Sequence, residues 1–211
     1  CSAARVLYLQ DEIAPRVVDM LVGAVEALAL GAPLDMATDI GPVIEETAQD
    51  AIEAHKMRMA RAHRKLVDAR LPDACRSGTY VTPAVYEVGK LADIGGEVFG
   101  PVLHVVRYGR GRLADVVREI NAAGYGLTLS LHSRLEAGAD EVAEHARVGN
   151  LYVNRNQIGA VPGVQPFGGE GLSGTGPKAG GPNMLTALSV ERVRTTDVTA
   201  TGGNFDLLSR V

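Results

Sequence analysis

The chain has 211 residues, 46% of them hydrophobic, which is enough to bury the core of one or two globular domains. Its net charge of −4, with both signs interspersed, gives no basic surface, so nucleic acid is excluded as the main partner. Asp19 and Glu26 interrupt the longest apolar stretch, which therefore falls short of the roughly 18 residues that a membrane-spanning helix needs.

A strand and a helix are expected directly after the first residue, Cys1. Residues 5–10 form a short β-branched and aromatic run that predicts a strand. Apolar side chains then recur at helical spacing over residues 12–30, with Pro15 in the first turn and Gly31 placed to end the helix. We expect this helix to cover one face of a sheet.

A second helix is expected over residues 45–62, with an apolar face and with Lys56 turned toward water. His55 on this helix and His63 after it are interpreted as partly exposed polar residues. No cysteine or carboxylate at metal-ligand spacing accompanies either histidine, so no metal site is expected.

The following segments alternate between the two element types. We expect strands at 65–71, 80–85, 102–108 and 127–133, and helices at 113–122 and 139–148. Such alternation implies right-handed crossovers between parallel strands. The predicted fold class is therefore α/β, with a mainly parallel sheet covered by helices.

A glycine-rich stretch, residues 148–181, follows a short strand predicted at 150–154. It contains ten of the 25 glycines and three of the ten prolines, a density that excludes a long helix or strand. Connections longer than roughly 12–15 residues are mostly functional or disordered, and the apolar residues Tyr152 and Phe167 argue against disorder. We interpret the stretch as a binding loop whose backbone amides can approach a small anion.

The end of the chain is expected to be separate from the rest. Residues 182–189 predict a short helix, and residues 191–203 alternate like an edge strand that pairs with a partner subunit. We therefore divide the chain into a domain at 1–190 and a C-terminal strand and tail at 191–211, and we expect a homo-oligomer formed through this strand.

Cys1 is the candidate nucleophile, because a thiolate is strongly nucleophilic and also a good leaving group. The other cysteine, Cys75, is interpreted as structural. Two cysteines cannot make a disulfide framework, which fits a reducing cytoplasm. Two alternatives stay open: a hydrolase that uses an N-terminal cysteine as nucleophile, whose folds stack antiparallel sheets, and a non-catalytic oligomerisation module.

Four motifs in order resemble the aldehyde dehydrogenase superfamily. They are Cys1-Ser2-Ala3, the Asp39-Ile40-Gly41-Pro42 element, the run Glu97-Val98-Phe99-Gly100-Pro101-Val102, and GNLYVNRN followed by PFGGEGLSGTG. The segment IGAVPGVQPFGGEGLSGTGPKAGGP and the tail TATGGNFDLLS look most like the L-glutamate γ-semialdehyde (Δ1-pyrroline-5-carboxylate) dehydrogenase domain of bifunctional proline utilization enzymes.

The resemblance implies an NAD-dependent oxidation of L-glutamate γ-semialdehyde to L-glutamate. Cys1 would be the nucleophile, forming a thiohemiacetal and then a thioester. Glu97 would accept the hydroxyls of the nicotinamide ribose, with Phe99 packed beside the cofactor.

The resemblance also implies a substrate-binding group. Ser2 would donate its hydroxyl to a substrate carboxylate, and the amides of Gly159 and Ala160 would hold the α-carboxylate. Phe167 would pack on the aliphatic part of the substrate, and Asn154 resembles a buried asparagine near the nucleophile that supports the structure.

Several parts of the family pattern have no counterpart in the 211 residues. Among them are the cofactor-binding domain, the oxyanion-hole asparagine and the upstream general base. Since the chain opens on cysteine rather than methionine, we expect it to be the C-terminal catalytic part of a longer polypeptide, which in a bifunctional enzyme would also bind FAD. The isolated chain is then expected to be inactive.

Overall fold

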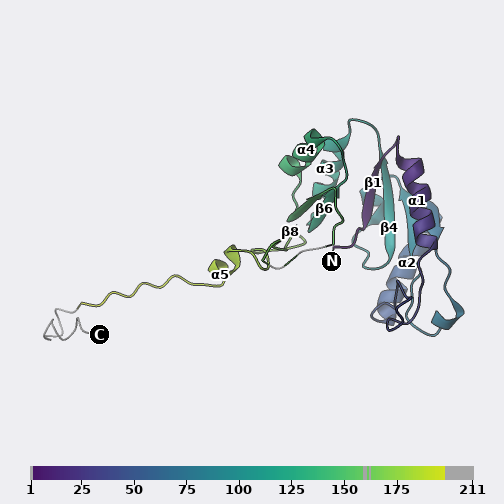
Figure 1. Cartoon of the computed structure of the whole chain (residues 1–211), viewed down its shortest axis with the longest axis horizontal. Helices are drawn as coiled ribbons and strands as arrows, with labels where there is room; N and C mark the ends of the chain where they lie inside the picture. The colour runs from purple at the N-terminus through teal and green to yellow at the C-terminus, as the bar shows by residue number, and fades with distance from the viewer. Residues whose placement is uncertain (1, 159–160, 162, 198–211) are drawn as a thin grey trace.

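The computed structural model describes residues 2–158, 161 and 163–197, and its largest sheet has four strands (Figure 1). In spatial order these are β1 (Val6–Gln10), β4 (Val102–Tyr108), β3 (Ala84–Val88) and β2 (Arg64–Asp68). β4 pairs in parallel with both β1 and β3, and β2 pairs antiparallel with β3. The sheet is therefore mainly parallel, as the sequence predicts.

Two helices cover the two faces of this sheet. α1 (Ala14–Glu26) packs on the face that includes Val105, and α2 (Glu46–Ala62) packs on the face that includes Tyr86. The strands serve both layers because successive side chains point to opposite faces. Val105 is fully buried and Tyr86 is 1% exposed, so both faces of the sheet are shielded from solvent at these positions.

The remaining elements form a second group beside β1. It contains α3 (Leu113–Ala122), α4 (Glu136–His145) and two small sheets: β6 (Thr128–Leu131) parallel to β7 (Asn150–Val153), and β5 (Tyr125–Gly126) antiparallel to β8 (Glu170–Gly171). Short helical segments complete the chain: η1 (Asp73–Cys75), η2 (Leu91–Ile94) and α5 (Asn183–Ala187). Figure 1 shows β1 on the side of the four-stranded sheet that faces this second group.

The elements predicted up to residue 189 are present, with shifted ends in several cases. β4 and α3 have the predicted bounds, whereas α1 ends at Glu26 rather than near residue 30. The strand predicted at 80–85 is observed as Ala84–Val88. Pro83 explains this shift, because proline has no amide proton to donate to a strand ladder. The α/β fold class is confirmed.

Two predictions about α2 are wrong. His55 is not partly exposed but 8% exposed, and Lys56 does not face water but is 5% exposed. Lys56 Nζ donates to Thr82 Oγ1 at 2.7 Å and lies 3.2 Å from an Asp68 carboxylate oxygen. Burying a charge is tolerable only when it is paired, and Lys56 is paired. His63 is half-exposed, as predicted.

The predicted C-terminal strand is not observed in the described part of the tail. Residues 191–197 form no strand, and residues 198–203 lie outside the described residues. Figure 1 shows the chain after α5 leading away from the two groups of elements. Because a strand that pairs with a partner subunit has no partner in a single chain, the oligomerisation strand and the boundary at residue 190 stay predictions.

Candidate functional site

A cavity of about 680 Å³ lies where the two groups of elements meet. One wall comes from the N-terminal segment and β1, including Ala3 and Arg5, and another from β6, including Thr128. Glu97 and Phe99, both predicted to bind the cofactor, also line it. The structure thus brings the segment that follows Cys1 to the same cavity as the predicted cofactor residues.

Glu97 and Phe99 project from a turn between η2 and β4. Gly95 and Gly96 have φ of 81° and 141°, values that L side chains rarely adopt, so the turn depends on glycine here. The Gly100 amide donates to the Val98 carbonyl at 3.1 Å. The Glu97 side chain is 43% exposed and Phe99 is 64% exposed, so both are accessible to a ligand.

Arg5 contacts both of these residues, and the sequence analysis did not single it out. Its Nε lies 3.8 Å from Glu97 Oε1, and its guanidinium carbon lies 4.8 Å from the centre of the Phe99 ring. Since 3.8 Å exceeds hydrogen-bond length, the ion pair is loose. A cation that follows a candidate nucleophile by a few residues is the only sequence signal that could have identified Arg5.

Glu119 of α3 holds the start of η2, the short helix that leads into this turn. Its carboxylate accepts a hydrogen bond of 2.7 Å from the Leu91 amide. Together with burial, the same carboxylate raises the pKa of the Tyr8 hydroxyl above its ordinary value, so Tyr8 stays neutral. Tyr8 and Glu119 line the large cavity and also a smaller one of about 220 Å³.

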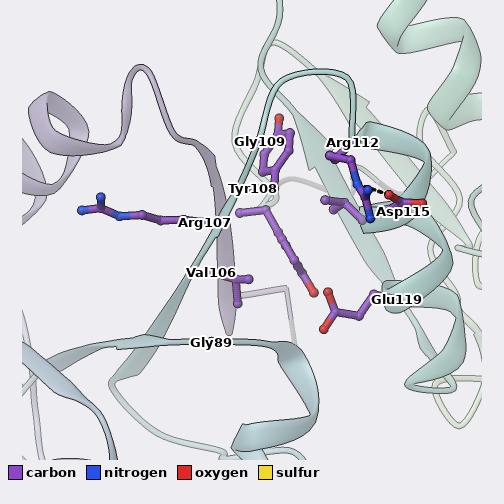
Figure 2. Close-up of a pocket in the computed structure, with 10 residues that line it drawn as sticks. Gly89, Val106, Arg107, Tyr108, Gly109, Arg112, Asp115 and Glu119 are labelled. Atoms are coloured by element: carbon purple, nitrogen blue, oxygen red, sulfur yellow. Dashed lines mark ion pairs between the residues drawn. The ribbon is translucent and has the colours of Figure 1, made fainter.

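The smaller cavity contains none of the predicted site residues (Figure 2). Figure 2 shows Glu119 on α3 and, one helical turn earlier, the ion pair between Arg112 and Asp115. Arg107 points away from this cavity and pairs with Glu87 at 2.9 Å. We assign no ligand to the smaller cavity, because its charged groups already pair within the chain.

The glycine-rich stretch is folded onto the second group of elements. The buried Asn150 side chain donates to the Pro166 carbonyl at 3.0 Å and accepts from the Gly168 amide at 3.3 Å. Lys178 Nζ donates to the carbonyls of Gly149 and Gly168. These contacts hold the described part of the loop against β7, and they fit the prediction that the loop is not disordered.

Some of the glycines serve close backbone packing rather than ligand binding. A Cβ at Gly149 would lie 1.7 Å from the Gly168 oxygen, and one at Gly169 would lie 2.6 Å from the Ser173 oxygen. Both distances are too short for non-bonded atoms, so each of these backbone approaches depends on the absence of a side chain at the glycine. Gly149 and Gly169 are therefore packing positions, and the interpretation that backbone amides of this loop can approach an anion stays a prediction.

The remaining predicted substrate residues are only partly described. Cys1, Gly159 and Ala160 lie outside the described residues. Ser2 is half-buried, three residues before Arg5 in the wall of the cavity. Gln157, two residues before Gly159, also lines the cavity, so the predicted carboxylate-binding pair follows a residue that the structure places there.

Phe167 and Asn154 lie outside the lining of the cavity. Phe167 is half-buried and forms a bridge with Ala179, with backbone hydrogen bonds of 3.1 and 2.8 Å. Asn154 is exposed rather than buried, with φ of 55°, and its side chain bonds both backbone groups of Ser133. The expected structural role of Asn154 therefore fits, but its expected burial is wrong.

Two further features bear on ligands and membranes. The described residues include no cluster of three or more His, Cys, Asp or Glu side chains that could hold a metal ion. None of the helices in the described part has the length and apolar character that crossing a bilayer requires.

Comparison with known proteins identifies the family. A family model described as aldehyde dehydrogenase family matches residues 1–193. The chain belongs to the aldehyde dehydrogenase family. Membership does not favour the alternative of an N-terminal nucleophile hydrolase, and neither does the mainly parallel sheet, since that class stacks antiparallel sheets.

The chain is similar to proteins of proline metabolism. It is 52% identical to the bifunctional protein PutA of Escherichia coli (strain K12) over 197 residues, covering 91% of this chain and 15% of that protein. It is 34% identical to the 1-pyrroline-5-carboxylate dehydrogenase of Bacillus subtilis (strain 168) over 188 residues, covering 88% of this chain and 36% of that protein. The chain thus spans a minor part of these relatives.

Solved structures agree with the sequence comparisons. A variant of Bradyrhizobium japonicum Proline Utilization A (PutA) matches with a TM-score of 0.84 at 48% identity, covering 88% of this chain and 19% of that one. A 1-pyrroline-5-carboxylate dehydrogenase matches with a TM-score of 0.79 at 33% identity, covering 88% of this chain and 36% of that one. The aldehyde dehydrogenase fold therefore extends over most of the chain.

Proposed function

We propose that the chain is the catalytic part of a longer enzyme that oxidises L-glutamate γ-semialdehyde to L-glutamate with NAD in proline catabolism. The observation that carries the proposal is the cavity that joins the N-terminal segment to Glu97 and Phe99. The similarity to PutA and to 1-pyrroline-5-carboxylate dehydrogenases selects the substrate class.

The described residues fit the nicotinamide end of NAD. A carboxylate accepts both hydroxyls of a ribose, and the exposed Phe99 ring beside Glu97 offers an apolar face next to that ribose. When bound, NAD accepts a hydride. Arg5, which is loosely paired with Glu97 at 3.8 Å, would keep this carboxylate oriented until a ribose hydroxyl takes its place.

Cys1 supplies the nucleophile in this proposal. Its thiolate adds to the aldehyde carbon, forming a carbon–sulfur bond and placing the negative charge on the former carbonyl oxygen. Departure of the hydride from that carbon re-forms the carbonyl group and leaves a thioester. Water then cleaves the carbon–sulfur bond, which releases L-glutamate and regenerates the thiol.

The substrate carboxylate is bound by the segments that flank the cavity. Ser2 donates its hydroxyl, and the amides of Gly159 and Ala160 donate to the α-carboxylate, because short side chains let the backbone close on an anion. Phe167 packs on the aliphatic part of the substrate. Phe167 does not line the cavity in this structure, so its role rests on the resemblance of the PFGG motif alone.

Other parts of the enzyme come from outside the 211 residues. We propose that the preceding polypeptide provides the adenosine and pyrophosphate contacts to NAD and, in a bifunctional enzyme, a proline dehydrogenase domain with FAD. We further propose a homo-oligomer formed through residues 191–211. The cytoplasm is the proposed location, because two cysteines without a disulfide framework suit a reducing compartment.

NADH formation by the longer polypeptide tests the proposal. The wild-type enzyme should oxidise L-glutamate γ-semialdehyde with NAD, and Cys1→Ala should abolish turnover without unfolding the protein. Ala160→Leu should raise KM for the semialdehyde far more than it changes stability. Turnover by Cys1→Ala at a rate close to that of the wild type would refute the role of Cys1.

A further inference from the structure

A buried pair of histidines lies behind the turn that carries Glu97. His55 of α2 is 8% exposed and His104 of β4 is 1% exposed. Their Nε2 atoms are 2.8 Å apart, and the two rings meet edge to face with centroids 5.0 Å apart. Both rings are thus joined by one direct hydrogen bond inside the core.

The groups at the two ends of this pair fix the direction of every hydrogen bond. Arg58 Nη2 lies 3.0 Å from His55 Nδ1, and a guanidinium only donates, so this nitrogen accepts. The neutral His55 ring therefore donates from Nε2 to His104 Nε2. His104 then donates from Nδ1 to the Arg5 carbonyl at 3.2 Å, an atom that only accepts.

The chain of hydrogen bonds ends at η2 on one side and at the Arg5 backbone on the other. At one end, Arg58 donates to the carbonyl oxygens of Asp93 at 3.1 Å and Ile94 at 2.5 Å, in η2 just before the Glu97 turn. At the other end is the backbone of Arg5, whose side chain contacts both Glu97 and Phe99. The same chain thus connects the turn to the segment that leads from Cys1.

We propose that Arg58, His55 and His104 are positioning residues that hold the Glu97 turn in a fixed place relative to the segment carrying the nucleophile. The inference rests on the proposed function, because it assigns the turn to NAD binding. Arg58 is the bridging residue, since one guanidinium bonds the turn and the histidine pair at once. Its planar set of donors suits this task better than a lysine would.

Neither histidine of the pair can take up a second proton without losing a hydrogen bond. Protonating His55 at Nδ1 would set that N–H against the Arg58 guanidinium, and protonating His104 at Nε2 would set two N–H groups against each other. Burial, then the neighbouring His104 and Arg58, lower the pKa of His55 to about 4. Burial, Arg58 and His63 also lower the pKa of His104, against the raising effect of its bond to the Arg5 carbonyl.

Hydrogen exchange in the 211-residue chain tests the mechanical part of the inference. Arg58→Met removes the bridge, and the amides of residues 91–100 should then exchange at least about tenfold faster than in the wild type. Arg61→Met is the matched control. Arg61 is exposed on the same helix, and its side chain makes no hydrogen bond or ion pair with another residue in the described part of the chain. This control should leave the exchange unchanged.

A second variant breaks the chain at a different point. In His55→Leu/His104→Leu both partners become apolar, so neither ring nitrogen is left unpaired in the core. The Arg5 carbonyl keeps its 3.1 Å bond from the His104 amide, which the substitution does not remove. Faster exchange of the turn in this folded double variant would show that Arg58 needs its anchor.

The KM for NAD in the longer polypeptide tests the functional part. Arg58→Met should raise this KM about tenfold while KM for the semialdehyde changes less than twofold, a split that general destabilisation would not produce. Exchange within twofold of the wild type, or an unchanged KM for NAD, would overturn the inference. If Glu97→Ala also leaves KM for NAD unchanged, the error lies in the proposed function of Glu97 instead.

Discussion

The histidine pair predicts a specific loss of stability in mild acid. In the unfolded chain His55 titrates near 6.5, whereas in the folded chain its pKa is about 4. Between these values the unfolded chain binds a proton that the folded chain does not, so the free energy of unfolding falls as pH falls through this window. From pH 7 to pH 5 the difference for His55 alone amounts to about 2 kcal/mol.

His104 adds to this loss, because its pKa is also lowered. Tyr86 of β3 pairs with His104 of β4 in the sheet register. It does not titrate between pH 5 and pH 7, since burial and the Asp68 and Glu53 carboxylates raise its pKa to about 12. Urea unfolding at pH 7 and pH 5 measures the loss, with His55→Leu/His104→Leu as the reference that subtracts all other groups. A wild-type loss within about 0.5 kcal/mol of the loss in this variant would refute the reasoning, because it would mean that the folded pair takes up protons freely.

Other predictions concern single contacts and the missing part of the enzyme. Lys56→Met should lower the free energy of unfolding in urea by about 2 kcal/mol, because Asp68 and Thr82 lose a partner whose side chain is 6% exposed. Arg61→Met should change stability by less than about 0.5 kcal/mol. Gly149→Ala should lower the free energy of unfolding by about 3 kcal/mol or more, since its Cβ would meet the Gly168 oxygen at 1.7 Å. Its control is Gly23→Ala in α1, which has open space around it and should stabilise the chain by about 0.5–1 kcal/mol. In calorimetric titration the 211-residue chain should bind NAD weakly or not at all, because in the proposal Glu97 and Phe99 would contact only the nicotinamide end. Micromolar binding by a monomer would contradict this.

The local pattern of the sequence was enough to place most elements. Residues 102–108 are apolar and β-branched between a Gly-Pro pair and a glycine, so both ends of β4 were defined. The end of α1 was less certain, because apolar residues continue past Glu26 at similar spacing. The error at β3 arose because apolar residues flank Pro83 on both sides, and hydrophobicity alone does not say on which side pairing begins.

Contacts between distant residues were beyond the local pattern. His55 meets a partner 49 positions away, and Lys56 meets Thr82 26 positions away, so neither bond leaves a trace in the spacing along α2. From the pattern of the helix we expected Lys56 to face water, and we expected His55 to be partly exposed because it is polar. Their burial depends on strands β2 to β4, which supply the partners.

The candidate site divides in the same way. Glu97 and Phe99 came from a contiguous motif, and the structure places both at the large cavity. Three other segments contribute residues that contact this motif or the η2 helix before it, namely Arg5, Glu119 and Arg58. None of these residues belongs to a short motif. The glycine-rich loop was identified by composition, but only the structure shows that Gly149 and Gly169 are packing positions.

Mass spectrometry of the acylated enzyme tests the central proposal most directly. The longer polypeptide would be mixed with NAD and L-glutamate γ-semialdehyde, quenched in acid within the first turnover, and digested. The proposed mechanism predicts a thioester adduct on the Cys1 peptide that requires NAD, and none on Cys75, which is 3% exposed in the core. NADH formation without an adduct on Cys1, or with the adduct on another residue, would contradict it.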